Sequence, residues 1–160
     1  MKKIIIFFLM ILSITIFSEE YKPYLKKNTN NKNLVFSAQI KDSKKVISIY
    51  KENKKLIYVY GSEGEKAEKI IIGTANKNLF KNENEIPLNE NNNNKLTENF
   101  ILFKVKNYTY LISFYNNYGV KENSYTLTVA KNDEEILFDK ELDISTVYDN
   151  LFNTNFFKKL

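Results

Sequence analysis

The feature that most constrains the fold of this chain is a series of short runs in which apolar and polar residues alternate. The first run places Leu34, Phe36 and Ile40 on one face of a strand. The eight runs lie at residues 34–40, 46–50, 56–60, 67–73, 100–105, 108–115, 125–129 and 136–142. Most of them are separated by turns short enough for hairpins. The pattern predicts an all-β fold, an antiparallel eight-stranded meander that forms a small barrel or a two-layer sandwich.

Three segments depart from simple alternation. The run at 67–73 is apolar on both faces, which predicts a central strand. Residues 76–99 are rich in Asn, contain Pro87 and have few apolar residues, so a long loop is expected there. In the tail, residues 144–160, apolar residues recur four positions apart from Val147 to Leu151, and this spacing predicts a short C-terminal helix.

The N-terminus has the layout of a secretory signal peptide. Lys2 and Lys3 precede a mostly apolar stretch at residues 4–17, and Ser18 is a small residue before a polar segment. This stretch is shorter than the roughly 20 residues of a membrane-spanning helix. We expect a leader over residues 1–18, an extended lead-in over 19–33 and the all-β domain over 34–143. The expected location is the periplasm or the exterior, with membrane contact only through the leader. An uncleaved anchor and a buried strand are the alternatives.

Missing residue types exclude several kinds of chemistry. The chain has no Cys, His, Trp or Arg, and all 24 of its basic residues are Lys. Disulfides, zinc or haem sites built on Cys or His, and His-based triads are therefore impossible. We expect no cofactor and no resident metal. Nucleic acid is not an expected partner, because bidentate readout of phosphate and guanine relies on Arg.

Few residues remain that could support catalysis. Asp133, Glu134 and Glu135 are adjacent, but neighbouring strand residues point to opposite faces, so they do not form a carboxylate pair. Ser43 with Lys44 and Lys45 lies in a charged turn, where a Lys is not deprotonated. The expectation is that the protein is not an enzyme. A small carboxylate-dependent cell-wall hydrolase is the alternative.

Aromatic residues provide the candidate binding site. The chain contains 11 Tyr. Most aromatic side chains are expected in the core, whereas Tyr beside polar turns suits a protein partner or glycan stacking. The candidates are Tyr58, Tyr60, Tyr115 and Tyr118; half-burial at sheet edges is the competing interpretation. We expect a monomer that binds an unknown protein or glycan of the cell envelope. A structural subunit of a surface assembly is a further possibility, and the runs are short for a membrane-spanning barrel.

One stretch resembles a known group of proteins. Residues 34–62 contain Phe36-Ser37-Ala38, Ile47-x-Ile49-Tyr50 and Leu56-x-Tyr58-x-Tyr60-Gly61. This pattern resembles uncharacterised small exported β-domain proteins of Gram-negative bacteria, in which cysteines fall near the positions of Ala38 and Tyr50. The layout is more distantly similar to periplasmic lysozyme inhibitors, although none of their inhibitory residues maps onto this chain. The resemblance implies an exported all-β domain and adds no catalytic residue.

Overall fold

The fold consists of two five-stranded antiparallel sheets. The computed structural model describes residues 21–74, 79–87, 95–117 and 122–151, so the predicted leader lies outside the described residues. The first sheet has the order β10-β1-β2-β3-β4 and the second β5-β6-β7-β8-β9. Their bounds are β1 (Leu34–Gln39), β2 (Lys45–Glu52), β3 (Lys55–Ser62), β4 (Lys69–Thr74), β5 (Leu79–Pro87), β6 (Lys95–Val105), β7 (Tyr108–Asn117), β8 (Glu122–Lys131), β9 (Glu135–Glu141) and β10 (Tyr148–Asp149).

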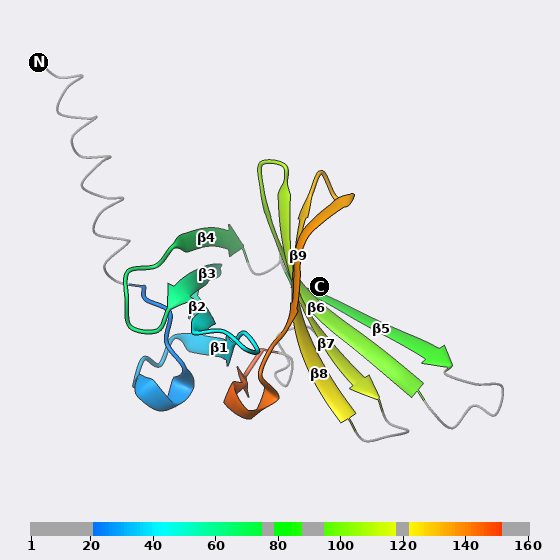
Figure 1. Cartoon of the computed structure of the whole chain (residues 1–160), viewed down its shortest axis with the longest axis horizontal. Helices are drawn as coiled ribbons and strands as arrows, with labels where there is room; N and C mark the ends of the chain where they lie inside the picture. The colour runs from blue at the N-terminus through cyan, green and yellow to red at the C-terminus, as the bar shows by residue number, and fades with distance from the viewer. Residues whose placement is uncertain (1–20, 75–78, 88–94, 118–121, 152–160) are drawn as a thin grey trace, which may run out of the picture.

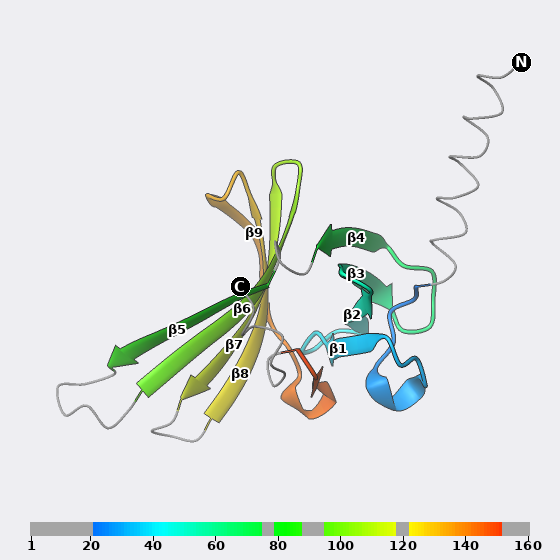
Figure 2. The same cartoon turned by 180° about the vertical axis from the view of Figure 1, so that it is seen from behind.

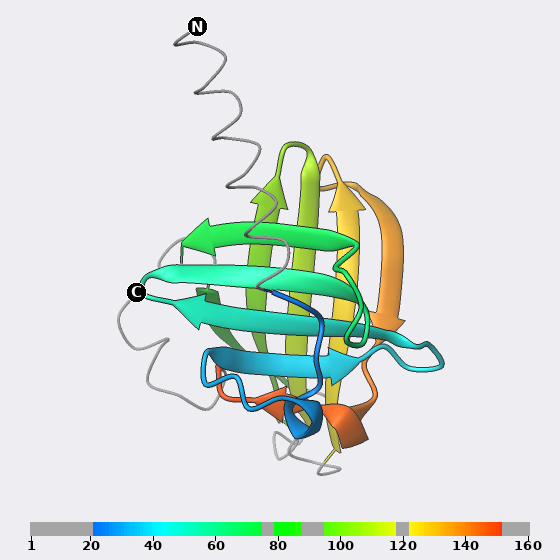
Figure 3. The ribbon, with the colours of Figure 1, turned by 90° about the vertical axis from the view of Figure 1, so that its left-hand side faces the viewer.

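The two sheets pack face to face as separate layers (Figure 1 and Figure 2). Their strands cross steeply (Figure 3). One core fills the space between them, because strands of both sheets turn apolar residues inward. Its members include Phe36, Ile47, Ile49, Leu56 and Tyr58 from the first sheet and Ile101, Phe103, Ile112 and Leu127 from the second.

The sheets meet at one corner without forming a closed barrel. An isolated bridge joins Ile40 to Leu142. Beside it, Lys41 N donates to the Glu141 carbonyl at 3.0 Å. No other bridge joins the sheets among the described strands, so the strand pairing does not continue around the molecule. The two-layer arrangement is therefore observed, and the predicted barrel is not.

Strands form at all eight predicted runs, and their turns follow local chemistry. Most of the non-glycine residues with positive φ in the described turns are Asn or Asp, whose short polar side chains tolerate this region. They are Asp42, Asn53, Lys106, Asn132 and Asp133. Each falls in or beside a predicted turn. The local sequence therefore determines where these hairpin turns occur in both sheets.

The prediction for β4 is wrong. This strand is the edge of the first sheet and not a central strand. Ile71 points inward and is buried, whereas Ile72 is 50% exposed. A run that is apolar on both faces is typical of two-sided burial, but here the chain leaves the sheet after β4 to begin the second layer. Ile72 therefore remains at an open edge.

The predicted loop at 76–99 is also wrong in part. Residues 79–87 form β5, and β6 begins at Lys95. The two strands pair antiparallel, with Phe80 opposite Phe100 and Ile86 opposite Leu96. Strand propensity is strongly dependent on context. A neighbouring strand offers backbone hydrogen bonds whatever the side chains, which explains how an Asn-rich segment extends the sheet.

The predicted C-terminal helix is not supported. Ile144–Thr146 form a single 3-10 turn, η2, and β10 then pairs with β1. Val147 and Leu151 belong to the core between the sheets, whereas Tyr148 packs on the opposite face of the first sheet. This alternation has the period of a strand. The free edge of β1 offers backbone hydrogen-bond partners to β10, which the spacing of apolar residues does not reveal. The rest of the predicted helix, residues 152–160, lies outside the described residues.

The lead-in packs on the outer face of the first sheet. We call its described part, residues 21–33, the strap; it includes a 3-10 turn, η1 (Lys26–Asn28). Tyr21 and Leu25 are buried, and Tyr21 shares a second core cluster with Leu34 and Tyr50. The Tyr50 hydroxyl donates to the Lys22 carbonyl at 2.6 Å. The strap thus shields the first sheet's outer face from water.

Candidate functional site

An apolar pocket opens between the two sheets. We call it the interlayer pocket, and its volume is about 190 Å³. Its lining residues come from five strands and are Tyr58, Tyr60, Lys69, Tyr110, Leu127, Val129 and Phe138. Pockets that enclose drug-sized ligands measure roughly 300–1,000 Å³. The interlayer pocket is smaller and suits one large side chain.

The tyrosines of the pocket converge because of strand geometry. Tyr58 and Tyr60 are two positions apart on β3 and therefore share a face. Tyr110 reaches the same space from β7, and its ring centroid lies 5.6 Å from that of Tyr58 in a tilted arrangement. Tyr58 also packs against Phe103, with 5.6 Å between centroids. These aromatic contacts hold the floor of the pocket rigid.

Of the described residues that line the pocket, only Lys69 is charged, and it lies at the rim. Lys69 is the first residue of β4 and is paired with Tyr60 in the sheet. Its side chain is exposed, and its Nζ lies 5.9 Å from the Tyr110 ring centroid. Such a placement gives a modest cation–π attraction. Within the described part of the chain, no carboxylate lies within ion-pair distance of Lys69.

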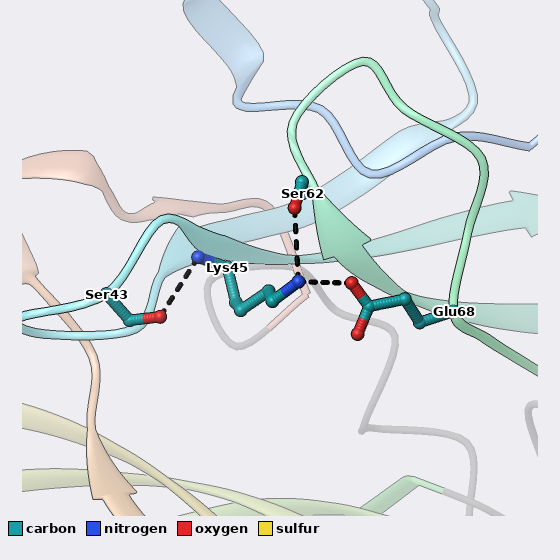
Figure 4. Close-up of polar contacts among 4 residues, drawn as sticks. All are labelled: Ser43, Lys45, Ser62 and Glu68. Atoms are coloured by element: carbon teal, nitrogen blue, oxygen red, sulfur yellow. Dashed lines mark hydrogen bonds and ion pairs between the residues drawn. The ribbon is translucent and has the colours of Figure 1, made fainter.

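The neighbouring lysine is already paired. Lys45 Nζ points between Ser62 and Glu68, as Figure 4 shows. It donates to Ser62 Oγ at 3.1 Å and forms an ion pair with Glu68. The hydrogen bond to the Glu68 carboxylate raises the pKa of Lys45 above its ordinary value. A lysine base requires the opposite shift, so Lys45 does not activate Ser62 as a nucleophile.

Ser43 has a structural role in the same region. Its Oγ accepts a hydrogen bond from the Lys45 backbone N–H at 3.1 Å (Figure 4). This bond closes the turn between β1 and β2 on itself, as Ser side chains commonly do in turns.

A second, charged pocket continues from the first. It shares Tyr60 and Phe138 with the interlayer pocket and has a volume of about 410 Å³. Its other lining residues are Ile40, Lys41, Asp42, Ser43, Asp139, Lys140 and Glu141. Lys41 and Glu141 form an ion pair at 2.5 Å. The two pockets therefore adjoin at Tyr60 and Phe138, one with a mostly apolar lining and one with a charged lining.

The structure separates the four predicted binding residues. Tyr58 and Tyr60 lie together in the interlayer pocket. Tyr58 is only 1% exposed, so the expectation of an exposed ring is wrong for this residue, while Tyr60 is half-buried. Tyr115 is five residues from Tyr110 on β7 and therefore faces the other side of the second sheet. Tyr118 lies outside the described residues.

Tyr58 and Tyr60 have raised pKa values. Burial raises the pKa of Tyr58 far above its ordinary value, and burial likewise raises that of Tyr60. Neither can serve as a base near neutral pH. Their contribution to the pocket is aromatic surface.

Several pocket residues were not found by sequence reasoning. Val129 and Phe138 are paired across the β8–β9 hairpin, whereas Lys69 comes from β4, far from them in the chain. Tyr110 lies within the predicted strand at 108–115 but is not among the predicted binding residues. No local pattern indicates that Lys69 meets the residues of the second sheet, because the packing of the two sheets brings them together.

Asp133 and Glu134 lie in the β8–β9 turn, and Glu135 is the first residue of β9. Lys104 Nζ is 2.6 Å from Asp133 Oδ2, and Thr109 Oγ1 donates to the other carboxylate oxygen. The hydrogen bond from Lys104 lowers the pKa of Asp133. A general acid needs a raised pKa, so Asp133 has a structural role. In the described ranges, no cluster of three or more acidic residues is arranged to hold a metal ion.

Comparisons with known proteins add no identification. No protein family, no curated protein and no solved structure matches this chain. The resemblance to exported β-domain proteins therefore stays a prediction. Among the described residues, no helix has the length and apolar character needed to cross a membrane.

Proposed function

We propose that this chain is an exported, non-catalytic envelope protein that binds or inhibits a protein partner through the interlayer pocket. The observation that carries this proposal is an apolar pocket with an aromatic floor and a single rim lysine. Interface anchors are commonly large apolar side chains that enter well-packed pockets. The signal-like N-terminus supports export.

A protein partner fits this site better than a glycan. Sugar stacking uses an exposed aromatic face, whereas Tyr58 is buried and Tyr60 is half-buried. The pocket is small and its lining is mostly apolar, with Leu127, Val129 and Phe138 among its residues. An inserted apolar side chain gains from leaving water there, while a sugar loses hydrogen bonds to water.

The hydrolase alternative finds less support. The pKa of Asp133 is lowered and that of Lys45 is raised, and each shift opposes the corresponding catalytic role. Nucleophile activation needs a base that is unprotonated at working pH. Binding without turnover is consistent with both observations.

A structural subunit of a surface assembly is the second candidate. Exposed edge strands favour association, and β4 and β9 are the edges of their sheets. Ile72 of β4 is 50% exposed and Ile136 of β9 is 65% exposed. Sedimentation velocity distinguishes this candidate, since a chain that remains monomeric at high concentration argues against it.

Capture from an envelope extract tests the binding proposal. The intact chain is immobilised beside two charge-reversal variants, Lys69→Glu at the pocket rim and Lys54→Glu in the β2–β3 turn. We expect one protein to be retained in near-stoichiometric amount by the wild type and by Lys54→Glu, and to be lost on Lys69→Glu. Lysozyme is added to the extract as a specific candidate. Retention that is identical on all three columns, or absent from all, contradicts the proposal.

A further inference from the structure

Among the described residues that line the interlayer pocket, the one with a charged side chain is Lys69, so the pocket carries a positive charge at its rim. Lys41 is paired with Glu141 and Lys45 with Glu68, which neutralises the two neighbouring lysines. Lys69 contacts the Tyr110 ring and has no carboxylate partner among the described residues. A ligand that fills the pocket therefore meets an apolar interior and one cation.

Distance limits where an anionic group of the ligand must lie. The Tyr110 ring forms a wall of the pocket, and Lys69 Nζ is 5.9 Å from its centroid. In an extended peptide, side chains two positions apart point the same way and are separated by about 6.6 Å. An apolar side chain in the pocket thus places a carboxylate two residues away within reach of Lys69.

The position of β4 allows such a peptide to approach. β4 is the outermost strand of the first sheet (Figure 3), and Lys69 is its first residue. Extended partner segments commonly bind along exposed sheet edges. A segment that runs past this edge can insert one side chain between the layers while its backbone remains outside.

We propose that the interlayer pocket recognises an extended segment of a partner protein with a large apolar side chain and, two residues away, a carboxylate that pairs with Lys69. This inference rests on the proposed function and specifies the partner's chemistry. The apolar residue supplies most of the affinity, because it is fully removed from water. An exposed ion pair with Lys69 adds little affinity. The acidic residue therefore serves mainly to orient the segment and to select it over segments that lack a carboxylate.

Synthetic peptides test the inference without knowledge of the natural partner. The probe is acetyl-Gly-Ser-Phe-Ser-Asp-Ser-Gly-amide, and matched peptides replace Asp by Asn or Lys, or Phe by Ala. Methyl NMR signals of Leu127 and Val129 in the intact chain report pocket occupancy. We expect saturable shifts with the probe, affinity about fivefold lower for the Asn peptide, and loss of binding for the Ala peptide.

A variant pair isolates the role of Lys69. In Lys69→Met the Asp and Asn peptides should bind equally, whereas Lys54→Met should retain the preference for Asp. A preference that survives in Lys69→Met overturns the proposal, as does equal binding of the Phe and Ala peptides. Free 3-phenylpropanoate, which carries a phenyl ring and a carboxylate but no peptide backbone, is tested as a small-molecule control. If it binds and none of the peptides does, the proposal of a protein partner is overturned. Peptide failure combined with successful capture from extract rejects this inference while the proposed function stands.

Discussion

Ser37 and Ser48 lie directly opposite each other on β1 and β2, and both hold the backbone of the strap. Ser48 Oγ accepts from the Tyr24 N–H and donates to the Tyr24 carbonyl, both at 2.8 Å. Ser37 Oγ accepts from the Lys26 N–H at 3.1 Å. Both serines are 0% exposed. Two small polar residues on an otherwise apolar face thus dock the N-terminal segment.

We expect Ser48→Ala to destabilise the fold by about 1–3 kcal/mol, because it leaves two backbone groups of Tyr24 without these partners. Urea unfolding measures the change. Ser124→Ala, at an exposed site, should stay within about 0.5 kcal/mol of wild type. Unchanged stability of Ser48→Ala, with the strap still resistant to proteolysis, contradicts the assigned role.

Tyr125 and Asp149 connect the second sheet to β10. The Tyr125 hydroxyl donates to Asp149 Oδ2 at 2.8 Å. Because the acceptor is a carboxylate, Tyr125→Phe should reduce the free energy of unfolding by about 1.5–3 kcal/mol. Asp149→Asn keeps an acceptor oxygen and should cost less. Thermal and urea unfolding of both variants check the order, and a neutral Tyr125→Phe argues against this connection.

The two predicted binding tyrosines on β3 should differ in their effects on stability. Tyr58 is buried in the core, so Tyr58→Ala should cost about 3–5 kcal/mol. Tyr60 is half-buried at the pocket margin, and Tyr60→Ala should cost clearly less while enlarging the pocket mouth. Urea midpoints of the two variants give the comparison. Equal losses contradict the assignment of Tyr58 to the floor and Tyr60 to the margin.

Stability should fall as the solution becomes alkaline. Burial raises the pKa of Tyr50 from its ordinary value of 10.0 to about 12. Between these values the unfolded chain releases the phenolic proton and the folded chain keeps it, so unfolding becomes more favourable as pH rises. The stability is fully present below pH 10 and is lost through pH 12.

Tyr50→Phe separates this contribution from those of other groups. The variant loses the hydrogen bond to the Lys22 carbonyl, so it should be less stable at neutral pH. Its decline between pH 10 and 12 should be shallower than that of wild type. Urea midpoints across this window provide the test, and parallel declines would falsify the raised pKa of Tyr50.

Sequence reasoning failed where partners come from distant parts of the chain. The spacing of Val147 and Leu151 fits a helix and a strand equally well. The segment forms a strand because the open edge of β1 is available for pairing. Residues 79–87 carry weak strand signals, and pairing with β6 ordered them into β5. In both segments, backbone hydrogen bonds to a neighbouring strand outweighed local preference.

The sequence by itself determined the all-β class, the eight strand cores and the Asn and Asp residues at the turns. These features depend on alternation and backbone preferences over a few residues, which are local properties. Only the tertiary structure decided that the strands divide into two crossed layers, that β4 is an edge and that the strap covers a sheet. It also brought Tyr58, Tyr110 and Lys69 together. Such contacts join residues far apart along the chain, and local patterns do not specify them.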